Sequence, residues 1–91
     1  MQITAELSLY PLETDYLPRV VSFIQDLAGS SGIECVVNQM STQLRGELDD
    51  VTRIITQALQ NSFADGHAQA LVVKYLNAGL PISEEPDLDL A

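Results

Sequence analysis

The sequence predicts an α+β domain in which a four-stranded sheet is covered on one face by two helices. Three observations carry this prediction. Four segments show the alternation or the β-branched and aromatic content of half-buried strands, and two others place apolar residues at helical spacing. Their order along the chain is strand, helix, strand, strand, helix, strand. Because 91 residues with 46% apolar side chains suffice for one modest core, we expect a single domain.

The first strand and the first helix occupy the N-terminal third of the chain. Residues 2–10 alternate apolar and polar side chains, and Pro11 is expected to end this strand because it lacks the N–H that a ladder requires. Thr14 or Asp15 is expected to cap the helix, whose first turn contains Pro18. The apolar stripe of this helix comprises Leu17, Val20, Val21, Ile24 and Leu27. A Gly-Ser-Ser-Gly sequence then ends the helical pattern.

A β-hairpin is predicted in the middle of the chain. Its strands are residues 33–40 and 42–48, and the small polar residues between them suit a tight reversal. Asn38 and Met40 then share a strand face with Glu34, because successive side chains point to opposite faces. A face that carries a carboxylate, an amide and a thioether together is typical of a binding-site floor or a subunit interface.

The second helix, the last strand and an acidic segment complete the chain. Asp49 or Asp50 is expected to cap the second helix, and an Asp-Gly pair ends it. The buried stripe of this helix comprises Val51, Ile54, Ile55, Ala58 and Leu59. Residues 68–76 are expected to form the last strand. We therefore predict a ligand-binding domain over residues 1–79 and a mobile acidic tail over residues 80–91, which offer little to bury.

This order of elements is that of the ferredoxin-like βαββαβ sandwich, with two helices on one face of an antiparallel sheet. Right-handed crossovers place the first and third strands in its centre. The other sheet face is left open and is expected to carry Glu6, Ser8 and Tyr10 from the first strand, with Glu34 from the second. A single layer of helices cannot cover this face, so we expect a second subunit to cover it.

Composition and charge exclude several kinds of partner. Thirteen acidic residues against four basic ones give a net charge of −9, which opposes phosphate backbones and anionic lipid surfaces. Nucleic acids and membranes are therefore not expected partners, whereas cationic or neutral small molecules are. The single cysteine, Cys35, excludes an internal disulfide, and no apolar run reaches the about 18 residues of a membrane helix. We expect a cytoplasmic, soluble protein.

Three motifs resemble those of the thiamine-binding, YkoF-like family. They are Ser8-Leu9-Tyr10-Pro11-Leu12 near the end of the first strand, Asn38-x-Met40-Ser41-Thr42-Gln43 in the hairpin, and Gly46-Glu47-x-Asp49 before the second helix. The resemblance implies a ferredoxin-like domain that binds thiamine, or its hydroxymethylpyrimidine half, without converting it. It also implies pairing through the open sheet faces, so this one-copy chain is expected to form a homodimer or homotetramer.

The chemistry of such a ligand agrees with the polar residues of these segments. An aminopyrimidine needs both donors and acceptors, which carboxylates, amides and hydroxyls supply. The thiazolium ring is cationic, so Tyr10 or a nearby carboxylate can hold it by a cation–π or ionic contact, whereas the protein's negative charge disfavours a diphosphate. The candidate ligand-binding residues are Asn38, Thr42, Ser41, Glu34, Glu6, Ser8, Tyr10 and Met40. No catalytic residue, metal ligand or cofactor is expected.

Two other functions stay open on the sequence alone. An oligomerising interaction or regulatory module would use the open face only for subunit contact. A small acylphosphatase-like hydrolase would fit the fold, but it needs a basic cradle for phosphate, and the four basic residues show no such cluster. The candidate residues also have ordinary roles available to them: Asn38 can shape a turn, and Met40 can fill an interface. The chain has no Ser–His–Asp spacing and no glycine-rich phosphate loop, so we expect a protein that is not an enzyme.

Overall fold

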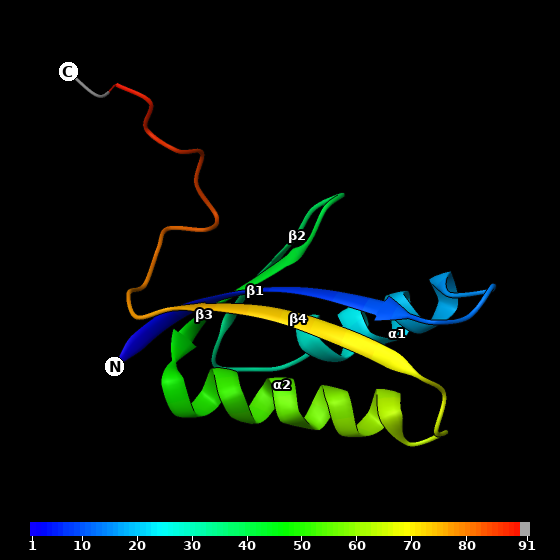
Figure 1. The fold of residues 1–91 in the computed structure, drawn as a ribbon. Helices are drawn as coiled ribbons and strands as arrows, with labels where there is room; N and C mark the ends of the chain where they lie inside the picture. The colour runs from blue at the N-terminus through cyan, green and yellow to red at the C-terminus, as the bar shows by residue number, and fades with distance from the viewer. Residues whose placement is uncertain (90–91) are drawn as a thin grey trace.

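The computed structural model describes residues 1–89 and has the predicted order of elements (Figure 1). The elements are β1 (Gln2–Pro11), α1 (Leu17–Ala28), β2 (Glu34–Val37), β3 (Thr42–Glu47), α2 (Leu48–Phe63) and β4 (Gln69–Leu76). The strands form one antiparallel sheet in the order β2-β3-β1-β4, so β3 and β1 are central, as predicted. Both helices lie on the same side of this sheet, and the ferredoxin-like fold class is confirmed. Among the described residues, no helix has the length and apolarity needed to cross a bilayer.

The core lies between the sheet and the two helices. It consists of alternate residues of β1 with one residue of β3 and the inner faces of both helices: Ile3, Ala5, Leu7, Phe23, Leu27, Leu44, Val51, Ile54, Ile55 and Ala58. In α1 the prediction was partly wrong, because Phe23 is buried whereas Leu17 and Val21 are exposed. Positions 20, 23, 24 and 27 lie on one side of a helix of 3.6 residues per turn, and positions 17 and 21 lie away from its centre.

Both helices begin without the side-chain caps that were predicted. The N-cap of α1 is Tyr16 instead of Thr14 or Asp15, and Pro18 lies in the first turn. The N-cap of α2 is Glu47. Asp49 and Asp50 consequently lie within the first turn of α2, where their charge is favourable near the positive end of the helix dipole.

The strand β1 is longer than its neighbour β3, and this difference shapes the molecule. Pairing of β1 with β3 stops at Leu7 opposite Thr42, whereas pairing with β4 continues to Pro11. Pro11 was expected to end the strand but is part of it. The backbone N–H of Leu12 donates to Ala68 of the segment before β4 over 3.0 Å, so the backbone of Pro11 faces the opposite side. Because β3 has already ended there, the missing N–H of Pro11 costs no ladder bond.

The strand β2 is only four residues long because Asn38 reverses the chain. Its Oδ1 accepts hydrogen bonds from the backbone N–H groups of Met40 (2.9 Å) and Ser41 (3.0 Å). Its own N–H donates to the carbonyl of Ser41 over 3.0 Å. Such capture of backbone donors by an Asn side chain competes with strand pairing. The predicted strand over residues 33–40 is therefore too long, and Asn38 and Met40 lie in the β2–β3 loop.

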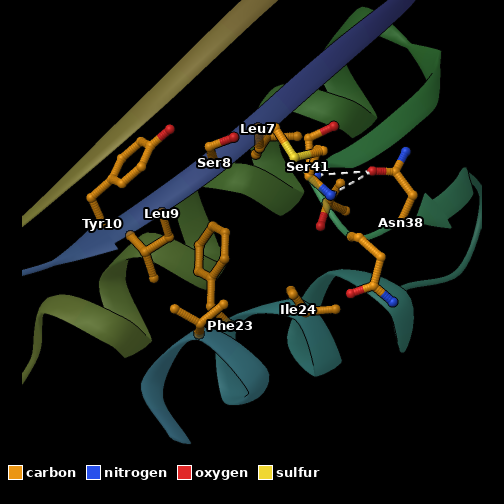
Figure 2. Close-up of a pocket in the computed structure, with 12 residues that line it drawn as sticks. Leu7, Ser8, Leu9, Tyr10, Phe23, Ile24, Asn38 and Ser41 are labelled. Atoms are coloured by element: carbon orange, nitrogen blue, oxygen red, sulfur yellow. Dashed lines mark hydrogen bonds between the residues drawn. The ribbon is translucent and has the colours of Figure 1, made fainter. Parts of the chain in front are cut away.

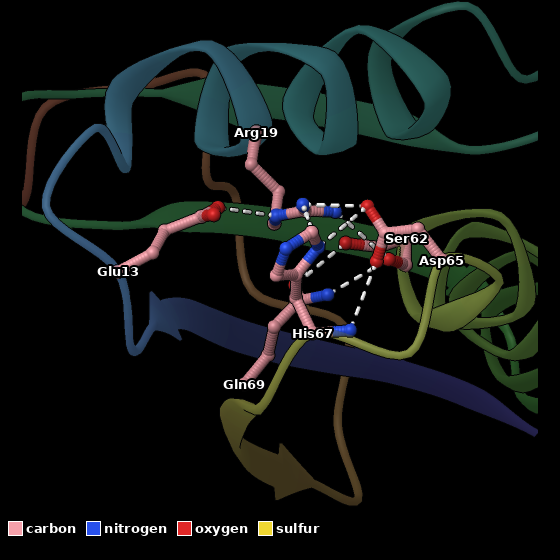
Figure 3. Close-up of polar contacts among 6 residues, drawn as sticks. All are labelled: Glu13, Arg19, Ser62, Asp65, His67 and Gln69. Atoms are coloured by element: carbon pink, nitrogen blue, oxygen red, sulfur yellow. Dashed lines mark hydrogen bonds and ion pairs between the residues drawn. The ribbon is translucent and has the colours of Figure 1, made fainter.

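A polar cluster around Arg19 joins the start of α1 to the end of α2 (Figure 3). The Nε of Arg19 donates to Glu13 over 2.6 Å, its Nη2 lies 2.6 Å from Oδ2 of Asp65, and its Nη1 donates to the carbonyl of Ser62 over 3.1 Å. The side chain of Arg19 is only 17% exposed. A hydrogen bond from the backbone N–H of His67, together with the Arg19 guanidinium, lowers the pKa of Asp65 to about 2. Charge-assisted contacts thus tie together segments that are more than forty residues apart.

Thr4 anchors the segment that follows β4. It is 8% exposed, its hydroxyl donates to the carbonyl of Ala78 over 2.7 Å, and it accepts from the N–H of Leu80 over 2.8 Å. The hydroxyl of Ser83 also donates to Glu34 over 3.3 Å. Residues 80–89 form neither helix nor strand, and the last two residues of the predicted tail lie outside the described residues. The first part of the tail is therefore held against the open face of the sheet.

Replacing Gly46 by alanine is expected to destabilise the fold by about 1–3 kcal/mol, because it overpacks the core. A Cβ atom at this position would lie 2.8 Å from Cγ2 of Ile33 and 3.5 Å from Cγ2 of Val51. Urea denaturation of Gly46→Ala measures the loss. In a double-mutant cycle, Ile33→Ala should lower the free energy of unfolding less in the Gly46→Ala protein than in the unmodified protein, because it removes the atoms that the new Cβ would crowd. Independent, additive effects would contradict this account.

The lowered pKa of Asp65 predicts a specific sensitivity to acid. The ionised carboxylate stabilises the fold fully above its ordinary pKa of 3.8, and this contribution is lost as pH falls towards about 2. The free energy of unfolding should therefore fall more steeply over this range in the unmodified protein than in Asp65→Asn. Asp15→Asn is the matched control, because Asp15 is exposed and makes no ion pair or hydrogen bond within residues 1–89. Parallel profiles for all three proteins would refute the prediction.

Candidate functional site

A pocket of about 160 Å³ opens where β1 extends beyond β3 (Figure 2). Its walls are the end of β1, one side of α1 and the β2–β3 loop, and we call it the edge pocket. It is lined by Leu7, Ser8, Leu9, Tyr10, Val20, Phe23, Ile24, Asn38, Gln39, Met40, Ser41 and Thr42. The first two sequence motifs, about thirty residues apart, thus form facing walls of a single cavity.

One side of the edge pocket is apolar. Leu9 and Phe23 point toward one another in Figure 2, and Ile24, the next residue of α1, also lines the pocket. The volume is close to that of an apolar cavity of about 150 Å³ that takes up benzene in another protein. The edge pocket therefore has room for one six-membered ring, and a second linked ring would project outside it.

The other side of the edge pocket is polar, and its most buried group is Thr42. This residue is 4% exposed, and its hydroxyl has no hydrogen-bond partner within residues 1–89. Every fully buried side-chain oxygen of the described residues has a hydrogen-bond partner, so the unpartnered Thr42 hydroxyl is one that solvent still reaches. The hydroxyls of Ser8 and Tyr10 are also without a partner in the described part of the chain. The pocket thus offers three hydroxyl groups that can donate or accept.

The β2–β3 loop forms the rim of the edge pocket. Oδ1 of Asn38 is occupied by the turn, whereas its Nδ2 makes no hydrogen bond to the described residues. The hydroxyl of Ser41 donates to Oε2 of Glu6 over 3.3 Å, and Met40 is 87% exposed. These side chains shape the entrance more than the interior.

The two predicted carboxylates lie farther away. Glu6 is on the open face, where its Oε1 is 3.5 Å from Nζ of Lys74, and it reaches the edge pocket only through Ser41. Glu34 lies beyond the pocket and pairs with Arg45 over 3.6 Å. Six of the eight predicted residues therefore line one cavity: Ser8, Tyr10, Asn38, Met40, Ser41 and Thr42.

Sequence reasoning missed the wall that α1 supplies. Val20, Phe23 and Ile24 repeat at helical spacing, which is the same signal that core residues give. Gln39 was missed because it sits between two residues of the motif with no feature of its own. Ser8 and Tyr10 were expected to contribute to a pocket on the open sheet face, whereas the edge pocket that they line is bounded by the end of β1, α1 and the β2–β3 loop.

The open face carries a second, shallower hollow of about 520 Å³. It lies between the β2–β3 hairpin and the chain after β4, and its lining includes Val36, Gln43, Leu80 and Ile82 with the acidic residues Glu84, Glu85 and Asp87. Only Asn38 is shared with the edge pocket. This hollow contains one of the eight predicted residues, so the edge pocket is the better candidate site.

Metal and thiol chemistry have no evident centre in the described residues. Within residues 1–89, no group of three His, Cys, Asp or Glu side chains is placed to hold a metal ion. Burial raises the pKa of the Cys35 thiol, which keeps it protonated and weakly nucleophilic at neutral pH. The candidate site is the edge pocket, which combines hydroxyl groups, amides and apolar side chains.

Solved structures share this fold along nearly the whole chain. A Streptococcus pneumoniae protein is 27% identical with a TM-score of 0.77, covering 91% of this chain and 92% of its own. A candidate thiamine biosynthesis/salvage protein of Thermotoga maritima is 16% identical with a TM-score of 0.75, at the same coverage of 91% and 92%. A hypothetical protein of Methanocaldococcus jannaschii is 20% identical with a TM-score of 0.74, covering 96% and 88%. The last two likenesses are similarities of fold.

The family comparison covers the whole of the candidate site. No curated protein sequence matches this chain significantly. The sequence model described as "Thiamine-binding protein" matches residues 5–75, which span β1 to β4 and include every residue that lines the edge pocket. The resemblance inferred from the three motifs is thus confirmed, and the chain belongs to the thiamine-binding protein family.

Proposed function

We propose that this protein binds thiamine through its hydroxymethylpyrimidine ring, or binds hydroxymethylpyrimidine itself, in the edge pocket and without converting it. The observation that carries the proposal is the cavity for a single ring, formed by two motifs of a thiamine-binding family around the unpartnered hydroxyl of Thr42. The likeness of fold to the candidate salvage protein of Thermotoga maritima agrees with a thiamine-related role.

The pocket chemistry suits the two halves of thiamine differently. The pyrimidine ring packs between Leu9 and Phe23, and Thr42 and Ser8 supply hydroxyls for its nitrogen atoms. The thiazolium ring projects past the rim, where Tyr10 is 54% exposed and Glu6 lies nearby on the open face. The net charge of −9 attracts this cation and disfavours the diphosphate form.

A homodimer or homotetramer built through the open face is part of the proposal. The residues of β1 and β4 that point to this face include Tyr10, Val72 and Leu76, which are 54%, 51% and 42% exposed. Apolar side chains on an uncovered sheet face are typical of subunit interfaces. A second copy placed there would lie against Tyr10 at the entrance of the edge pocket. We place this assembly in the cytoplasm.

The same exposed patch supports a second candidate function, an interaction or regulatory module that uses the open face without a small ligand. The two functions differ in what the purified protein takes up. Calorimetric titration with thiamine, hydroxymethylpyrimidine and thiamine diphosphate should give saturable binding of the first two and weaker binding of the diphosphate. No binding of any of the three by the folded protein would overturn the proposal and favour the interaction module.

Replacing Thr42 by valine separates a ligand-binding role from a structural one. The hydroxyl has no partner in the described chain, so its removal should leave the free energy of unfolding unchanged or slightly higher. The free energy of pyrimidine binding should weaken by about 1–3 kcal/mol.

Thr4→Val is the matched control, because that buried hydroxyl holds Ala78 and Leu80 and lies outside the edge pocket. It should lower thermal stability and leave affinity unchanged. A Thr42→Val protein with full affinity would exclude this residue from the site.

A further inference from the structure

The main chain of β1 presents one free donor and acceptor pair at the edge pocket. The N–H of Leu12 points to the β4 side, as its hydrogen bond to Ala68 shows. Because the backbone groups of successive strand residues point to opposite edges, those of Leu7 and Leu9 point to the β3 side. The pairing of β1 with β3 ends at Leu7 opposite Thr42. The N–H and C=O of Leu9 therefore have no hydrogen-bond partner among residues 1–89.

The register identifies the residue that would otherwise fill this place. Continuing the pairs of β1 and β3 by two residues would set Met40 opposite Leu9. Instead, Oδ1 of Asn38 accepts the N–H of Met40 over 2.9 Å and turns the chain toward β2. Leu9 and Met40 both line the edge pocket, Leu9 from β1 and Met40 from the β2–β3 loop. The gap beside Leu9 is thus the position that Met40 would occupy if β3 were two residues longer.

We propose that the ligand takes the place of Met40 in the ladder: the N–H and C=O of Leu9 bind the donor–acceptor edge of the aminopyrimidine. This inference rests on the proposed function and names the group that selects the ring. The exocyclic amine donates to the C=O of Leu9, and the adjacent ring nitrogen accepts from its N–H. Asn38 is a positioning residue, because it acts only by holding Met40 away from Leu9.

A main-chain pair selects more strictly than hydroxyl groups do. The hydroxyls of Ser8 and Thr42 can rotate and serve as donor or acceptor, whereas the N–H and C=O of Leu9 have fixed roles and directions. A pyrimidinone, in which oxygen replaces the exocyclic amine, presents an acceptor and an N–H donor in the reversed order. Both groups of Leu9 would then face their own kind, and each would give up its contact with water without gaining a hydrogen bond.

Calorimetry with three probes tests this selection: hydroxymethylpyrimidine, its pyrimidinone analogue and an analogue that lacks the amine. The pyrimidinone should bind at least about 100-fold more weakly than hydroxymethylpyrimidine, and the analogue without the amine should be intermediate, because it loses one hydrogen bond. Equal affinities for hydroxymethylpyrimidine and the pyrimidinone would overturn the role of Leu9 and leave the proposed function standing. Failure of hydroxymethylpyrimidine itself to bind would overturn the proposed function.

Amide hydrogen exchange measured by NMR tests the geometry directly. In the ligand-free protein the amide of Leu9 should exchange much faster than that of Leu7, which lies opposite Thr42 in the ladder. Saturation with hydroxymethylpyrimidine should slow exchange at Leu9. Slow exchange in the free protein, or no change on saturation, would contradict the proposal.

Two substitutions of Asn38 separate positioning from direct contact. Asn38→Asp keeps an oxygen for the N–H groups of Met40 and Ser41 but removes the free Nδ2 amide, so affinity should stay within about threefold. Asn38→Ala releases Met40, which can then pair with Leu9, so affinity should fall at least about tenfold and the Leu9 amide should exchange more slowly without ligand. An equal loss of affinity in both variants, with unchanged exchange at Leu9, would assign Asn38 a direct contact and refute its positioning role.

Discussion

The early end of the β1–β3 ladder is the constraint on which the candidate site depends. Asn38 takes the backbone donors of Met40 and Ser41, so β3 begins only at Thr42 and β1 continues alone on that side. This arrangement leaves the main chain of Leu9 and the hydroxyl of Thr42 without a partner in the described chain. It also lets side chains of α1 form one wall of the edge pocket. A hairpin two residues longer would restore the ladder and fill the cavity. The position of the candidate site is thus set by where the pairing of β1 with β3 stops.

The fold could be predicted from periodicity because β1 and both helices alternate between the core and the surface in a regular way. The inward residues Ile3, Ala5 and Leu7 of β1 occur at every second position, and tertiary packing then needs only one layer of helices. Periodicity did not reveal the end of β2, because the apolar Met40 shortly after Asn38 suggested that the strand continued. That end is decided by hydrogen bonds from the backbone to Oδ1 of Asn38, a local competition that leaves no mark on the pattern. Asn38 is thus shown to be a turn residue, whereas its role as a site residue stays a prediction.

The four basic residues offset only a small part of the protein's negative charge. All four cationic side chains are paired with carboxylates: Arg19 with Glu13 and Asp65, Arg45 with Glu34, Arg53 with Asp50 and Lys74 with Glu6. Each cationic side chain therefore lies beside at least one carboxylate, and the excess charge of the chain is acidic. The remaining carboxylates give the protein a negative potential, which opposes anionic ligands. Fold and charge therefore limit the candidate site in different ways, since the fold sets the volume of the edge pocket and the net charge sets the sign of the potential around it.

The unpaired groups of the edge pocket also link ligand binding to stability. The described chain supplies no hydrogen-bond partner for the Thr42 hydroxyl or for the main chain of Leu9. A longer β3 would pair Leu9, yet Asn38 prevents it with two hydrogen bonds of its own. A ligand that satisfies these groups binds the folded chain alone, since in the unfolded chain the same groups are solvated and apart. Occupancy must then raise the free energy of unfolding by mass action. A ligand that completes the interrupted ladder is thus expected to stabilise the empty protein at the place where strand pairing stops.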